Sequence, residues 1–111
     1  MNYQNVTPIQ LCQAAITTSV VTLYTVPVAT RTYLKDINVC NTTGSAVSIN
    51  IYLVPAGGTA SSANALVYSY SVAADSFFHW SGVQVLLPGQ TLQVSASATG
   101  TTIMASGGEA T

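Results

Sequence analysis

Apolar and polar residues alternate along most of this chain, which is the pattern of β-strands with one buried face. The clearest run is 47–53, where every second residue is a large aliphatic one. The runs at 36–40, 66–72 and 92–97 repeat the pattern, and β-branched residues, which suit a pleated and half-buried surface, are abundant. The alternation predicts an all-β protein whose core contains Ile49 and Ile51.

Turn-forming residues divide the chain into about eight strands. We expect strands at 9–17, 20–26, 32–40, 46–54, 65–72, 76–81, 90–97 and 101–106, with a short additional strand at 83–86 as an option. Gly44 is expected to supply a positive φ in one hairpin loop, and Gly100 to close another. The loop at 57–64 is long enough to cross between two sheets.

The length of 111 residues indicates one domain. Eight short strands close as a sandwich, a jelly roll or a barrel. We favour a single-domain antiparallel β-sandwich that is jelly-roll-like and spans residues 9–106. Residues 1–8 are expected to form an N-terminal arm, and residues 107–111 a flexible C-terminal tail.

Charged residues are scarce. They make up 5% of the chain, where a typical soluble domain has about 25%, and Ser, Thr, Asn and Gln supply the polar surface instead. The two cations, Arg31 and Lys35, are too few to line a groove for nucleic-acid phosphates. The apolar runs fall far short of the ~20 residues that span a bilayer, and the first residues lack the parts of a signal peptide. The composition predicts a structural or assembly protein with no nucleic-acid or membrane partner.

Several short motifs follow one another in a recognisable order. They are LYTVP at 23–27, KDINVCNTTG at 35–44, IYLVPAGG at 51–58 and LLPGQTL at 86–92. This succession resembles a family of small structural proteins from tailed bacteriophages, and the resemblance covers roughly residues 20–106. It implies an all-β virion component without enzymatic activity that decorates a head or contributes to a tail.

Composition and resemblance together lead us to expect a capsid decoration, or cement, protein. It would be assembled in the host cytoplasm, bind the outer surface of a phage head and stabilise the contacts between capsomers. The expected partners are further copies of this chain, as a trimer, and the major capsid protein. The alternatives are a tail, baseplate or head-fibre component and, in another class, a carbohydrate-binding module that uses Tyr52 or Trp80 as a stacking platform.

One candidate contact surface is the aromatic strand Phe77, Phe78, His79 and Trp80. Alternation places Phe77 and His79 on one face, with Phe78 and Trp80 on the other. Both faces carry large rings, so we expect a neighbouring subunit to cover at least one of them, because aromatic residues are enriched at interfaces. The second candidate is the N-terminal arm, whose Tyr3, Val6 and Pro8 would dock on a neighbouring subunit.

No catalytic, cofactor or metal site is predicted. His79 is the only histidine, so a metal ion would lack ligands. Cys12 and Cys40 are expected to be free and mostly buried thiols, with a disulfide between them as the alternative. Asp36 and Asp75 are formally a glycosidase pair, although Asp75 is typical of a turn.

Overall fold

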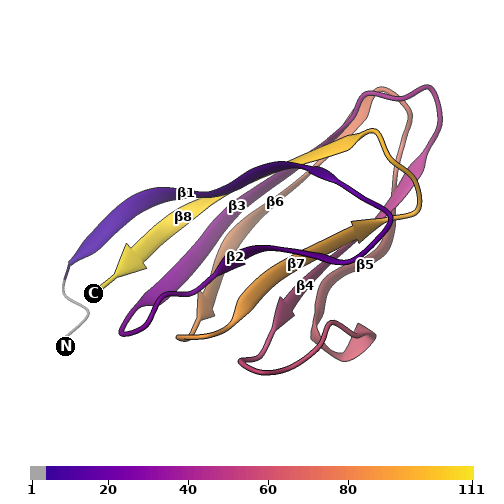
Figure 1. Cartoon of the computed structure of the whole chain (residues 1–111). Coiled ribbons are helices and arrows are strands. Elements are labelled where there is room, and N and C mark those ends of the chain that lie inside the picture. The colour runs from indigo at the N-terminus through magenta and orange to yellow at the C-terminus, as the bar shows by residue number, and fades with distance from the viewer. Residues whose placement is uncertain (1–4) are drawn as a thin grey trace.

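Eight β-strands form two four-stranded antiparallel sheets packed face to face in the computed structural model, which describes residues 5–111 (Figure 1). A single-turn 3-10 helix, η1 (Ser62–Asn64), precedes the fifth strand. The strands are β1 (Val6–Ile16), β2 (Val21–Thr25), β3 (Arg31–Asn41), β4 (Val47–Val54), β5 (Ala65–Val72), β6 (Ser76–Leu86), β7 (Thr91–Ala96) and β8 (Thr101–Ala110).

The strand order confirms the predicted jelly-roll-like sandwich. The first sheet has the order β1-β8-β3-β6 and the second sheet has the order β2-β7-β4-β5. The chain therefore changes sheet at every connection except the one between β4 and β5. The expectation for the loop at 57–64 was wrong, because this loop joins two strands that pair within the second sheet.

The core lies between the two sheets and is built from the aliphatic residues that the alternation selects. Ile49 and Ile51 of β4 are completely buried, and Leu34, Ile37 and Ile103 lie in the same core cluster. Burying a side chain of this size contributes about 1.5–3 kcal/mol. Because most of the domain's stability comes from this layer, the register of each strand is set by which of its faces carries these residues.

The sandwich extends further at both ends than the sequence predicted. β1 begins at Val6, which pairs with Ala110 at the end of β8, and the N–H of Thr111 donates to the carbonyl of Asn5 at 3.0 Å. The prediction of a flexible tail at 107–111 was therefore wrong for residues 107–110. The predicted arm at 1–8 was wrong for residues 6–8, while residues 1–4 lie outside the described part of the chain.

Three strands of the first sheet carry irregularities at the same level. The pairing of β1 with β8 shifts by one residue between Gln10 and Cys12. The pairing of β3 with β8 shifts between Leu34 and Asp36. At the same place two residues of β6 lie opposite one residue of β3. Leu34 and Ile37 are consequently both buried although they are three residues apart, and Lys35 is exposed. The predicted additional strand at 83–86 is the continuation of β6 beyond this point.

One end of the sandwich is fastened by a buried asparagine. Asn41 is fully buried, and its Nδ2 donates to the carbonyls of Ser45, Val72 and Ala73 at 2.9–3.2 Å. Its Oδ1 accepts the N–H and the hydroxyl of Thr43. This single amide therefore holds the β3–β4 turn against the β5–β6 turn.

Glycine is required at only one of the two predicted hairpin positions. Gly100 has a φ of 111°, in the region that favours glycine. The hairpin expected there was wrong, because the β7–β8 connection crosses from the second sheet to the first. Gly44 does not have a positive φ, so the expectation for it was wrong. The side chains of Asn41 and Thr43 shape that turn instead, and they make a left-handed residue unnecessary.

Replacing Thr101 by valine is expected to stabilise the protein. Thr101 is fully buried, and its hydroxyl has no hydrogen-bond partner within the described structure. Valine has nearly the same shape and removes the desolvated hydroxyl, so the free energy of unfolding should rise by about 1 kcal/mol. Urea denaturation measures the change. Thr32→Val is the matched control and should be destabilising, because the Thr32 hydroxyl bonds to Tyr24; equal effects of the two substitutions would contradict this account.

Candidate functional site

The aromatic strand β6 is an edge of the first sheet, and its two faces lie as the alternation predicted. Phe77 is 65% exposed and His79 is also exposed on the outer face. Phe78 and Trp80 are half-buried and pack against the core. The inward face is therefore part of this molecule's own packing, and the outward face is the one available to a partner.

Large exposed apolar residues gather where β5 and β6 run as edge strands of the two sheets. The rings of Tyr70 on β5 and Phe78 on β6 lie 4.8 Å apart between centroids with a tilt of 51°, which is a favourable aromatic geometry. Neither strand contains Asp, Glu, Lys or Arg. We call this surface the apolar edge; its residues are Tyr68, Tyr70, Phe77, Val83, Val85 and Leu87.

His79 has a carboxylate partner and no arrangement that suits a metal ion. Its Nε2 lies 2.6 Å from Oδ1 of Asp36, and the two side chains are 45% and 50% exposed. In residues 5–111 no three His, Cys, Asp or Glu side chains lie close enough to hold a metal ion together. A pair this exposed contributes little to stability.

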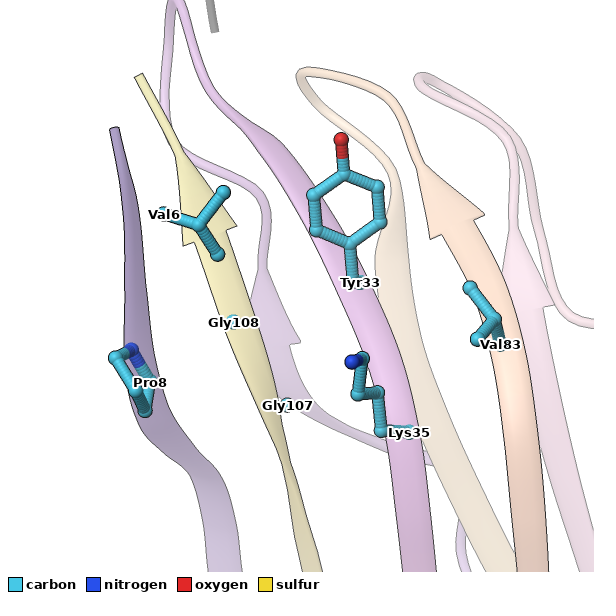
Figure 2. Close-up of a pocket in the computed structure, with 7 residues that line it drawn as sticks. All are labelled: Val6, Pro8, Tyr33, Lys35, Val83, Gly107 and Gly108. Atoms are coloured by element: carbon cyan, nitrogen blue, oxygen red, sulfur yellow. The ribbon is translucent and has the colours of Figure 1, made fainter. Parts of the chain in front are cut away.

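A shallow groove crosses the outer face of the first sheet, with a volume of about 460 Å³. Figure 2 shows its floor on β8, where two glycines present no side chain, and its walls on β1, β3 and β6. The lining residues are Val6, Pro8, Tyr33, Lys35, Val83, Gly107 and Gly108. The predicted arm residues Val6 and Pro8 thus lie on the same outer face as Phe77 and His79, whereas Tyr3 lies outside the described residues.

Sequence reasoning missed the groove and the part that β5 plays in the apolar edge. The pair Gly107 and Gly108 was the available signal, since two glycines directly after the alternating run 101–106 indicate either a chain end or a close approach of strands. The structure shows the second. Lys35 was missed as a groove residue because strict alternation places it on the core face.

The two groups with raised pKa values are held in their protonated forms. Burial raises the pKa of the Cys12 thiol, which makes it a poor nucleophile. Cys12 and Cys40 are both free. Burial, and then a hydrogen bond to the Glu109 carboxylate, raises the pKa of Tyr24 to about 12. Neither group is poised for acid–base chemistry near neutral pH.

Tyr24 joins the two sheets at the end opposite Asn41. Its hydroxyl lies 2.7 Å from the hydroxyl of Thr32 on β3 and donates to the carboxylate of Glu109 on β8. Tyr24 itself belongs to β2 of the second sheet. Glu109, expected in a flexible tail, is therefore part of a polar bridge across the sandwich.

Stability should fall more steeply with pH in the wild type than in Tyr24→Phe between pH 10 and pH 12. The folded-state pKa of about 12 lies above the ordinary value of 10, so the folded chain keeps a proton that the unfolded chain releases. This contribution is complete below pH 10 and is lost as the pH rises through 12. Urea unfolding of both proteins across this range measures the difference, and parallel pH profiles would rule out the bridge.

The alternative chemistries considered for this chain find no support in the arrangement of their residues. Asp36 pairs with Ser81, and Asp75 lies just before Ser76, so the backbones at the two positions are separated by five residues of strand, roughly 17 Å. A glycosidase pair needs about 5–9.5 Å. Tyr52 is only 7% exposed, so the expectation that it is an open stacking platform for sugars was wrong. Trp80 is half-buried and packs against the core.

Comparison with known proteins gives a likeness at the level of fold. No protein-family model matches the chain, and no curated protein matches it in sequence. A chain of the T13 viral particle of infectious bursal disease virus has a TM-score of 0.52 with 13% sequence identity, over 96% of this chain and 30% of that chain. A chain of the Gx strain of this virus has a TM-score of 0.51 and 16% identity, over 96% and 32% of the two chains.

These matches show a shared jelly-roll fold. This chain has a fold found in a viral particle. It spans about a third of the length of the chains it matches, and it has no helix in residues 5–111 that is long and apolar enough to cross a membrane.

Proposed function

We propose that this protein is a structural component of a virion, specifically a decoration, or cement, protein that binds the outer surface of a phage head. The apolar edge carries the proposal: five large apolar residues are exposed along β5 and β6, Leu87 follows directly after β6, and neither strand contains Asp, Glu, Lys or Arg. An exposed apolar patch of this kind is typical of a surface that another protein covers. The fold found in a viral particle and the resemblance to small phage structural proteins support the same class of function.

The proposed mechanism is adhesion without catalysis. Apolar side chains and uncharged polar groups would be buried against the major capsid protein and against further copies of this chain, and many weak contacts would add up by avidity. A protein that binds only the intact lattice shifts the stability of that lattice by mass action. Because so few charges take part, salt should weaken the binding little. For the number of copies in one assembly, the sequence predicts a trimer.

Reconstitution on phage heads tests the proposal. Heads that lack the protein should rupture at a lower temperature, and added wild-type protein should restore their resistance at both low and high salt. Phe77→Ser combined with Val85→Ser should abolish the restoration, because both residues belong to the apolar edge. Val28→Ser is the matched control, since Val28 is 89% exposed but lies in the β2–β3 connection away from that edge.

Imaging of virions decides between the head and the alternative positions. Density for this chain on the outside of the head, in many copies, is the expected result. Density confined to the tail, the baseplate or a head fibre would overturn the decoration proposal and leave the wider proposal of a virion component standing.

A further inference from the structure

The four edge strands of the sandwich differ in how well another strand can pair with them. β1 carries Pro8, which has no N–H, and an irregularity between Gln10 and Cys12. β2 has only five residues. β5 is interrupted at Ser69, which has a φ of 52° and gives its N–H to the Asn50 side chain at 2.8 Å. Proline, short length and irregular backbone are the features by which natural sheets protect their edges from other chains.

β6 has none of these protections over its first half. It is 11 residues long and contains no proline and no Asp, Glu, Lys or Arg. From Ser76 to Ser81 it pairs in unbroken register with β3 on one side. On its other side β6 pairs with no strand among the described residues, so a row of backbone N–H and C=O groups is left for a partner.

The side chains of this half of β6 also favour a neighbouring strand. Phe78 and Trp80 pack against the core but remain only half-buried, because no strand lies beyond them to complete their cover. Phe77 on the other face is 65% exposed. An added strand would complete the burial of the two inner rings and give the outer ring a cross-strand neighbour.

We propose that β6 pairs antiparallel with β6 of a second copy of this chain, so that two first sheets join into one continuous eight-stranded sheet. A second copy fits because this edge is complementary to itself. A twofold axis perpendicular to the sheet places inward residues opposite inward residues, so Phe78 and Trp80 of one copy meet those of the other. This part of β6 contains no Asp, Glu, Lys or Arg, and its one titratable side chain, His79, is bonded to Asp36 of the same copy. Aromatic cross-strand pairs are stabilising.

A twofold interface uses the same edge of both copies, so two copies cover both β6 edges and leave none for a third. The isolated chain is therefore expected to be a dimer, in place of the trimer that the sequence predicts. The inference does not depend on where in a virion the protein lies, so failure of the head-binding experiment leaves it untouched, and its own failure leaves head binding untouched.

Light scattering on isolated protein tests the pairing with two matched variants. Wild-type protein should have twice the mass of one chain. Phe77→Lys combined with Ser81→Lys brings lysines together near the twofold axis and should weaken the dimer at least about tenfold, leaving monomer at the same concentration. Tyr68→Lys combined with Ser71→Lys places the same charges on exposed positions of β5 and should leave the dimer intact. An unchanged thermal melt for both variants shows that each is folded.

Hydrogen exchange gives a second measurement that needs no substitution. Amides of β6 should exchange more slowly at concentrations where the dimer is populated than after dilution, while amides of β1 and β5 should not change. A wild-type monomer, a trimer that the β6 variant leaves intact, or concentration-dependent protection on another edge would each overturn the proposal. Protection of β6 only when capsid protein is added would overturn it as well, and would identify a capsid strand as the occupant of this edge.

Discussion

Replacing Gly107 by alanine is expected to lower the free energy of unfolding by at least about 3 kcal/mol. A Cβ atom at this position would overlap the backbone carbonyl oxygen of Tyr33 on the neighbouring strand β3. Backbone atoms in the middle of a sheet cannot move aside as the end of a flexible side chain can, so β8 and β3 must separate. A domain of this size is stable by only about 5–15 kcal/mol, so the loss is a large share of the total.

Gly44→Ala is the matched control for this substitution. A Cβ on Gly44 meets nothing within 4 Å, and its φ is not positive, so the change should cost less than about 0.5 kcal/mol. Urea denaturation of both variants gives the comparison. If Gly107→Ala were as mild as Gly44→Ala, residues 107–110 would form a loose tail, as the sequence suggested, and β8 would end before them.

Replacing Asn41 by alanine is expected to cost about 2–3 kcal/mol. The substitution removes the donor from the buried carbonyl of Val72 and from the part-buried carbonyls of Ser45 and Ala73. It also frees the Thr43 backbone and hydroxyl that shape the β3–β4 turn. Loss of a side chain that fastens two turns together should therefore lower stability and speed hydrogen exchange in both turns.

Two further variants test whether stability depends on the buried amide of Asn41 itself or on any polar residue in this part of β3. Asn41→Asp keeps an acceptor but loses the donor and directs a negative charge at three carbonyls, so it should be at least as destabilising as Asn41→Ala. Asn38→Ala, three residues away on the half-exposed face of β3, should cost no more than about 0.5 kcal/mol. Equal losses at positions 38 and 41 would show that the buried amide has no special role.

Most of the fold was predictable because alternation and turn residues are local signals. All eight expected strands exist, and Ile49 and Ile51 are buried as the pattern of 47–53 requires. The errors arose where structure depends on partners that are distant in sequence. Lys35 follows Leu34 in a run that alternates, yet it is exposed because of a bulge that involves β1 and β6 as well. Three strands change register at the same height in the sheet, and the sequence of one strand alone cannot predict this.

The candidate surface was predictable only in part for the same reason. The face that Phe77 and His79 share follows from the sequence of β6 alone. The contribution of Tyr68 and Tyr70 does not, because it requires knowing that β5 and β6 are the outer strands of two different sheets. The groove depends on Gly107 and Gly108 lying beside Val6 and Tyr33, residues from opposite ends of the chain.

The position of β8 in the first sheet limits which strands can pair early during folding. β8 is the last strand along the chain, yet it lies between β1 and β3 and pairs with both. β4 and β5 can pair as soon as both are synthesised, and so can β3 and β6, but β1 has no partner strand until β8 leaves the ribosome. Pairing of such distant segments is slow, on the order of milliseconds to seconds. Until then β1 and β3 lack their shared neighbour, so rapid pairing of the ten residues of β8 with both strands helps the folding chain to avoid aggregation.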